Sequence, residues 1–141
     1  MCKKPYPFKG VDPHDRVNVD KLHEAIKETR LNEDEGIKIV YTDQDIYSPG
    51  LDYVFGKAYA GDRICIVSSR RLQDVRDMDR TVERLVKVTL HEIGHLLRLT
   101  HCEDPGCVMY RSNDAVSVDG RALSFCERCA QNFGFSDIYV G

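Results

Sequence analysis

Apolar side chains recur along the chain with two periods, and together these predict a mixed α/β fold. Residues 17–30 carry apolar side chains at helical spacing and end before a polar turn that contains glycine, so we expect a surface helix there. Short runs rich in β-branched and aromatic residues at 37–41, 53–55 and 63–68 predict strands, and Ser48-Pro49-Gly50 predicts a turn. We therefore expect one α/β (α+β) domain over residues 1–141, with a twisted mixed sheet, a backing helix and a second long helix.

The second helix is expected at about residues 81–98, because one apolar stripe runs along it at roughly 100° per residue. We expect this stripe to face the core and His91 and His95 to project from the opposite side. The stripe comprises Val82, Leu85, Val86, Ile93, Leu96 and Leu97.

The segment HEIGHLLRLTHC, residues 91–102, contains three of the five histidines of the chain. His91 and His95 are four residues apart, so on a helix both imidazoles can reach one metal ion, and His101 can join them if the helix ends and the chain turns back. Three neutral imidazoles leave a tetrahedral Zn²⁺ with one open position, as in catalytic zinc sites. Glu92 lies beside that position and can accept a proton from a bound water. Histidines on a solvated helix face would explain one His and a chance Glu, but not the whole set.

Four cysteines follow the histidines in two closely spaced pairs, which predicts a closed structural zinc site with four thiolate ligands. Ser124 and Glu127 have capping-box spacing, which would place the second pair in the first turn of a helix. Two disulfides, or a thiol redox pair at the CxxC, are the alternatives. The four residues are Cys102, Cys107, Cys126 and Cys129.

These motifs, HExxHxxxxxHC followed by x₄-C-x-M and a CxxC, resemble those of the archaemetzincin family of zinc-dependent peptidases. The segments DIYSPGLDYVFGKA (45–58) and RICIVSSRRL (63–72) are also similar to the family's sequence before and within its edge strand. The resemblance implies a zincin-like fold, peptide-bond hydrolysis with Glu92 as general base, and two zinc ions per chain. It also implies that Met109 forms the methionine turn beneath the catalytic metal. The implied ligands are His91, His95 and His101 for the catalytic zinc, and Cys102, Cys107, Cys126 and Cys129 for the structural zinc in the region 102–129.

One position departs from the motif, because Arg98 stands where these peptidases carry glycine. That glycine ends the helix in a left-handed conformation, which costs a non-glycine residue about 1–2 kcal/mol. Zinc binding at comparable sites supplies on the order of 10 kcal/mol, so we expect the metal to bind in spite of the strain. An alternative function, a catalytically weak or inactive zincin-fold protein that binds peptides or partners, follows from this substitution.

The strand at residues 64–67 is expected at the edge of the sheet, where it would form the upper rim of the substrate cleft. An edge strand offers free backbone groups with which an extended peptide can pair. Tyr110 follows Met109 and could either reach the zinc or pack in the core. The expected substrate-binding residues are Ile64, Cys65, Ile66 and Val67.

Composition and charge restrict the partners. The chain has 141 residues, of which 42% are hydrophobic, and a net charge of −3, which argues against a general nucleic-acid-binding protein. No apolar run approaches the length that spans a membrane, and no targeting segment precedes the thiol-rich region, so we expect a cytoplasmic protein. We expect a monomer that acts on a peptide or protein substrate, with no nucleic-acid and no membrane partner.

Overall fold

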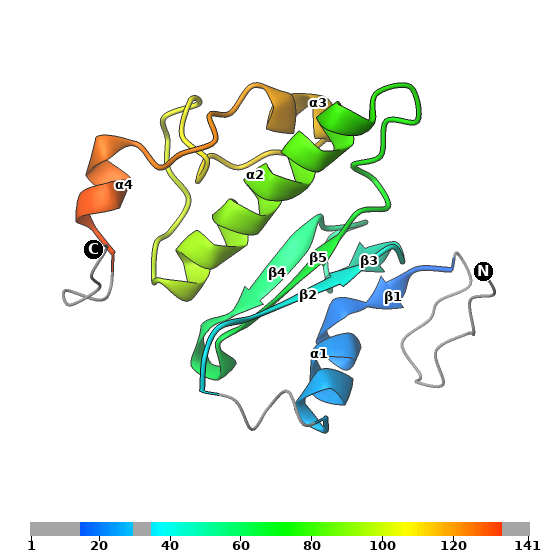
Figure 1. The fold of residues 1–141 in the computed structure, drawn as a ribbon. Coiled ribbons are helices and arrows are strands. Elements are labelled where there is room, and N and C mark those ends of the chain that lie inside the picture. The colour runs from blue at the N-terminus through cyan, green and yellow to red at the C-terminus, as the bar shows by residue number, and fades with distance from the viewer. Residues whose placement is uncertain (1–14, 30–34, 134–141) are drawn as a thin grey trace.

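The structure is a computed structural model that describes residues 15–29 and 35–133 (Figure 1). Short strands, interrupted by one α-helix and one short 3₁₀ helix, make up the first half of the described chain, and helices and long loops make up the second half. In chain order the elements are β1 (Val17–Asn18), α1 (Val19–Lys27), β2 (Lys38–Thr42), β3 (Ile46–Tyr47), β4 (Gly56–Tyr59), the short 3₁₀ helix η2 (Ala60–Asp62), β5 (Ile64–Ser68), α2 (Met78–Leu96), α3 (Ala115–Asp119) and α4 (Glu127–Gln131).

The main sheet has the strand order β2-β5-β4, with β2 parallel and β4 antiparallel to β5. The register pairs Ile66 of β5 with Val40 on one side and with Lys57 on the other. Strands β1 and β3 form a separate parallel pair. The predicted mixed sheet is therefore present, but β5 is its central strand.

The prediction of an edge strand at Ile64, Cys65, Ile66 and Val67 is wrong. Every residue of β5 is buried, and both of its edges are already paired, so its backbone cannot bind a substrate peptide. A run of β-branched residues is typical of a strand covered on both faces, and such a strand lies in the middle of a sheet. The antiparallel edge strand is β4 instead.

Helices cover both faces of this sheet (Figure 1). On the α1 side, Ile64 and Ile66 of β5 pack in a cluster with Leu22 and Ile26 of the helix. On the α2 side, Val67 belongs to a second cluster that contains Val88 of α2 and Val118 of α3. Alternate residues of β5 thus point to opposite layers, as the pleat of a strand requires, and the central strand ties the two cores together.

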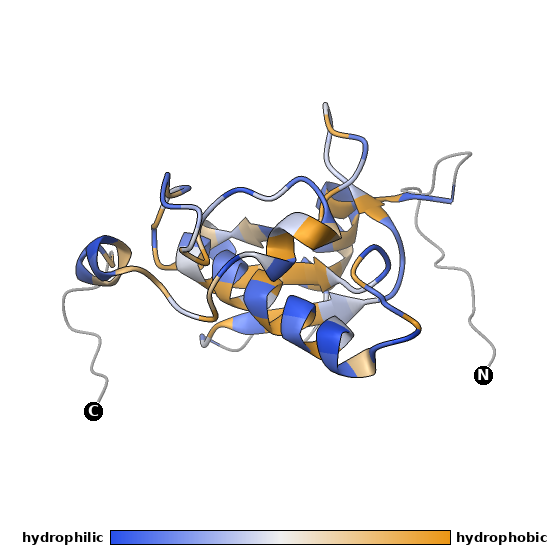
Figure 2. Cartoon of the chain, turned by 90° about the horizontal axis from the view of Figure 1, so that it is seen from above, coloured by the Kyte–Doolittle hydropathy of each residue, from blue (hydrophilic) through white to orange (hydrophobic). Residues whose placement is uncertain are grey.

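The burial predicted for the long helix is only partly right. Val82 and Val86 of the expected stripe are 55% and 42% exposed, whereas Arg84 and Lys87 are buried. Arg84 donates two hydrogen bonds to the carboxylate of Asp119 at 2.8 and 2.7 Å, and Lys87 donates one to the Asp119 carbonyl. Because α3 packs against this side of α2, long cationic side chains are buried there and the valines are left in contact with solvent. Figure 2 shows the resulting hydrophilic bands along the helix.

The boundaries of several elements differ from the predictions by a few residues. Helix α2 begins at Met78 rather than near 81, because the Asp77 side chain caps it by accepting from the Arg80 N–H at 3.0 Å. Helix α1 begins only at Val19, where Asn18 is the cap. Residues 53–55 contain an isolated bridge rather than a strand.

Strand β2 is less buried than predicted, with Ile39 and Tyr41 38% and 55% exposed. Within the described ranges, no helix is long and apolar enough to cross a membrane.

Candidate metal centre

Helix α2 ends in a left-handed turn at Arg98, whose φ is 73°. The Leu99 N–H donates to the Gly94 carbonyl at 2.9 Å, and the Arg98 N–H donates to the His95 carbonyl at 3.0 Å. This pair of bonds is the Schellman arrangement that usually has glycine at the left-handed position. Arg98 therefore adopts the conformation that the motif requires, and the chain turns back toward the helix.

The turn brings the three histidines together. One ring nitrogen from each of His91, His95 and His101 lies within 4.8 Å of the other two, and the Nε2 atoms of His91 and His95 are 3.2 Å apart. Two nitrogen ligands on a tetrahedral zinc ion are about 3.4 Å apart, given Zn–N bonds of about 2.1 Å. The spacing of the two helical histidines thus suits zinc.

Backbone carbonyls fix the tautomers of the two helical histidines. The Nδ1–H of His91 donates to the Val108 carbonyl at 2.8 Å, and that of His95 donates to the Leu99 carbonyl at 2.9 Å. Burial lowers the pKa of both rings, that of His91 to about 3, so both are neutral. Two unprotonated nitrogens that face each other at 3.2 Å repel, and a cation between them removes that repulsion. The donor set therefore fits a bound metal ion.

His101 is the most exposed member of the set, but partial burial of its ring is still enough to lower its pKa. Its Nδ1 lies 3.4 Å from Nη2 of Arg111, and within the described residues no backbone carbonyl holds it as carbonyls hold His91 and His95. The third histidine is thus held less firmly than the other two.

Glu92 lies beneath the histidines and is almost fully buried, with 6% of its surface exposed. Burial raises the pKa of its carboxyl group to about 8, against a smaller opposing effect of the Arg121 charge. Gly56 at the start of β4 leaves room for this side chain, because a Cβ there would lie 3.0 Å from Glu92 Cγ and 2.8 Å from the Ile66 carbonyl oxygen. A carboxyl group with a pKa near neutral is suited to exchange protons with a substrate or a water.

Met109 is fully buried beside the same helix. A Cβ at Gly94 would lie only 2.3 Å from its sulfur, so the methionine packs directly against the helix turn between His91 and His95. This position is compatible with the methionine turn that the sequence resemblance implies.

A cavity of about 570 Å³ opens over these residues. Its walls include His91, Glu92, His95 and His101 on one side and residues 51–58 on the other. Strand β4 pairs only with β5 among the described strands, so its second edge faces the cavity side. Tyr110 is not among the residues that line this cavity, and at 36% exposure it does not pack in the core.

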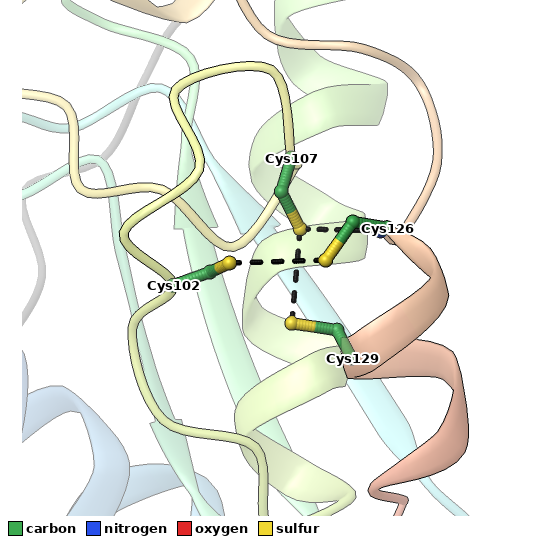
Figure 3. A group of neighbouring side chains, drawn as sticks. All are labelled: Cys102, Cys107, Cys126 and Cys129. Atoms are coloured by element: carbon green, nitrogen blue, oxygen red, sulfur yellow. Dashed lines mark hydrogen bonds between the residues drawn. The ribbon is translucent and has the colours of Figure 1, made fainter.

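The four cysteines meet in a second cluster, shown in Figure 3. The sulfur atoms of Cys102 and Cys126 are 3.8 Å apart, as are those of Cys107 and Cys129. Two thiolates on a tetrahedral zinc ion are separated by about 3.8 Å, given Zn–S bonds of about 2.3 Å. A disulfide needs about 2.05 Å, and all four thiols are free. The arrangement therefore suits a Cys₄ metal site better than two disulfides.

Hydrogen bonds to the sulfur atoms favour thiolate at one corner of the cluster. Burial opposes the Cys102 thiolate, but the Asp104 N–H and the Arg128 guanidinium outweigh it and lower the pKa of Cys102 to about 7. Burial raises the pKa of Cys107 and Cys129, so a cation is needed to keep these two sulfurs deprotonated. The predicted capping box is wrong, since Cys126 itself is the N-cap of α4 and no side chain caps that helix.

Sequence reasoning missed Arg121, which lines the cavity and is 4% exposed. Its Nη1 donates to the carbonyl oxygens of Val108 and Tyr110, both at 2.9 Å. A single arginine in the loop after α3 has no local pattern that would mark it, because its position depends on how that loop packs against α2.

Comparisons with known proteins show the family to which the chain belongs. The family model of Peptidase family M54 matches residues 13–134. The archaemetzincin of Methanopyrus kandleri is 43% identical over 90 residues, which cover 64% of this chain and 51% of that protein. The chain therefore spans about half the length of this curated relative. It likewise covers 48% of the archaemetzincin of Pyrococcus abyssi.

Solved structures show the same fold. The crystal structure of the M. kandleri archaemetzincin superposes with a TM-score of 0.80 at 32% identity, covering 86% of this chain and 67% of that chain. A zinc-dependent peptidase from Methanocorpusculum labreanum gives a TM-score of 0.79 at 29% identity, covering 93% of this chain and 82% of that one. The mixed α/β fold is thus the one found in archaemetzincin structures, and the chain belongs to peptidase family M54, the archaemetzincins.

Proposed function

We propose that this chain hydrolyses peptide bonds as a zinc-dependent peptidase, with His91, His95 and His101 as metal ligands and Glu92 as general base. The observation that carries the proposal is the convergence of three neutral imidazoles over a buried carboxyl group, in a cavity bordered by an edge strand. Bound zinc would supply Lewis acidity and lower the pKa of its water ligand. The relative from M. labreanum, which is described as a zinc-dependent peptidase, supports the same activity.

Glu92 would move the protons of the reaction. A carboxyl group whose pKa lies near 8 in the metal-free chain ionises more readily beside a dication, and it can then take a proton from water and return it to the leaving amine. Glu92 directly follows His91 on the helix, so it lacks the four-residue spacing that lets His91 and His95 reach one ion. It is therefore placed to act without binding the metal.

The substrate would lie along β4. The backbone of Gly56–Tyr59 has one free edge within the described sheet, so an extended peptide can add to it as a further strand. Gly56 contacts Glu92 at the start of that strand, which would bring the pairing peptide next to the proton-transferring group.

We propose a second, structural zinc at the four cysteines. Cys102 directly follows His101, and the loop that carries Cys107 also carries Val108, whose carbonyl fixes His91. A metal at the cysteines would therefore hold the loop on which the catalytic site depends.

The alternative function, a catalytically weak or inactive protein, was based on Arg98, but the conformation of Arg98 does not favour it. Arg98 occupies the left-handed position with the capping bonds intact, and His101 reaches the other histidines.

The test is cleavage of a mixed peptide library by zinc-loaded protein, followed by mass spectrometry. Glu92→Gln should reduce the rate by about 10²–10⁴-fold with unchanged zinc content. Glu103→Gln, the same chemical change at an exposed position, is the matched control and should cleave like the parent. A parent that cleaves nothing, or a Glu92→Gln variant that cleaves equally fast, would overturn the proposal.

A further inference from the structure

Arg121 is a buried cation in the wall of the candidate active-site cavity, and it holds the loop on which Met109 lies. Its side chain is 4% exposed. Nη1 donates to the carbonyls of Val108 and Tyr110, on either side of Met109. Nη1 also lies 3.0 Å from Nδ1 of His91, but both nitrogens are donors and share the Val108 carbonyl as acceptor.

Within the described residues, the charge of Arg121 lacks the carboxylate partner that a buried cation normally has. Arg84 is buried to a similar degree, at 6% exposure, and forms a two-pronged ion pair with Asp119. No carboxylate lies within ion-pair distance of Arg121 among the residues that the structure describes. Burial of an unpaired charge is costly, since the two neutral carbonyls do not compensate for its lost hydration. The contrast within one chain suggests that the anion comes from a ligand.

The Nε–Nη2 edge of the guanidinium forms no bond within the described residues, and Nε itself is buried. All the bonds that Arg121 makes within residues 15–29 and 35–133 involve Nη1, and Nε has no partner. The edge formed by Nε and Nη2 is one along which a guanidinium binds both oxygens of a carboxylate. Ser112 Oγ, in the wall of the same cavity, is a second buried polar atom without a partner in the described chain.

The remaining cavity charges do not serve this purpose. Asp52 also lines the cavity, but it is exposed and forms no ion pair with Arg121. Lys57 donates to Asp20 and Ser48 on the other face of β4, at 2.8 and 3.0 Å. Arg111 is exposed and lies against His101. Glu92 is the buried acid of the cavity, and the proposed reaction requires it to be free to exchange protons.

The location of Arg121 indicates which part of a substrate it can reach. Its Nη1 lies next to Nδ1 of His91, and the Nε2 of the same ring faces the other histidines. Nη1 of the guanidinium is therefore separated from the metal-binding nitrogen of His91 by the 3.0 Å to Nδ1 and the width of the imidazole ring, a distance that a short side chain beside the cleaved bond can span. Tyr53, Phe55 and Val88 add apolar wall to the same cavity.

We propose that Arg121 is a specificity-determining residue that binds the carboxylate of an aspartate or glutamate flanking the cleaved peptide bond. The expected effect on cleavage rests on the proposed peptidase function. The binding of a carboxylate by Arg121 does not depend on that function. Removing one partner of a buried charge pair commonly lowers affinity by about 30-fold or more. Peptides with an acidic residue at this position should therefore be cleaved preferentially.

The kinetic test compares peptides that differ only by Asp or Asn at each residue flanking the bond that the parent cleaves. At one of these positions kcat/KM should be at least about 30-fold higher for Asp. Arg121→Gln should reduce this ratio to about threefold or less, Arg121→Lys should retain part of it, and Arg111→Gln should leave it intact. A parent with no acid preference, or a preference that survives in Arg121→Gln, overturns the proposal.

A binding test separates this inference from the proposed catalysis. Succinate should bind the zinc-loaded protein more tightly than succinamate, its half-amide, by at least about tenfold in calorimetry, and the difference should vanish in Arg121→Gln. If no peptide is cleaved but this difference is found, the carboxylate site stands and the peptidase proposal fails. Equal affinity for the two probes counts against the site whatever the activity. Because Arg121 also holds the loop at Met109, circular dichroism is used to establish that each variant is folded. The preference of the parent protein for succinate over succinamate is measured without any variant.

Discussion

Replacing Arg98 by glycine should stabilise this protein, because the native chain already holds Arg98 in a left-handed conformation with φ of 73°. That conformation costs a non-glycine residue about 1–2 kcal/mol. Glycine removes this cost but makes the unfolded chain more flexible, which offsets about 0.4–1 kcal/mol. The net gain in the free energy of unfolding should therefore be about 0.5–1 kcal/mol, or a rise in Tm of about 2–4 °C for a chain of this size.

The assay is urea unfolding of zinc-loaded protein at fixed free zinc, with Arg98→Ala as the matched control. Alanine also has a Cβ and so should stay within about 0.5 kcal/mol of the parent. Zinc affinity, measured by competition with a chelator, should change less than about tenfold, because the capping bonds to Gly94 and His95 are already formed. If alanine stabilises as much as glycine, or if glycine destabilises, the Arg98 side chain rather than its backbone conformation matters and the reasoning is refuted.

Three further predictions test other parts of the site. Mild chelation should remove one zinc and leave the circular dichroism spectrum intact. Cys126→Ser should lower Tm more than His95→Ala does, because a closed thiolate site is coupled to folding. Equal effects of the two variants on Tm would contradict this. The folded-state pKa of Glu92, about 8, lies above its ordinary value of 4.5, so its contribution to stability is present below about pH 4.5 and is lost as the pH rises through 8. Metal-free Glu92→Gln should consequently gain up to about 4 kcal/mol over the parent between pH 5 and 9 in urea unfolding, and parallel pH profiles would count against the buried carboxyl. Gly56→Ala should cost about 1–3 kcal/mol, because its Cβ would lie 2.8 Å from the Ile66 carbonyl oxygen, and a variant as stable as the parent would mean that β4 has more room than the structure shows.

The sequence alone predicted the parts of the site that depend on local geometry. The helical spacing of His91 and His95 and the pairing of the cysteines need only one helix turn or one tight loop, so their convergence could be anticipated. The left-handed turn at Arg98 could be anticipated as well, because it follows from the position of His101 after the helix.

The sequence did not reveal the features that depend on tertiary packing. The β-branched alternation of Ile64–Ser68 is the same in an edge strand and in a central strand, and only the pairing with β2 and β4 decides between them. The apolar pattern of α2 likewise could not show that Arg84 and Lys87 would be buried and donate hydrogen bonds to Asp119.

Arg121 illustrates the same limit at the site itself. It reaches the cavity because α3 is anchored to α2 through Asp119, two residues earlier in the chain. No spacing or composition signal marks such a residue, since its neighbours in space come from loops far apart in sequence.

Anomalous diffraction at the zinc absorption edge, from crystals of protein purified without chelators, tests the central claim most directly. The account predicts two zinc peaks per chain. One should be bound by His91, His95 and His101, with a position left open toward the cavity and Glu92 not coordinated, and the other should be bound by the four cysteines. A peak at the cysteines alone, or a histidine site closed by a fourth protein ligand, would contradict the assignment of a catalytic zinc.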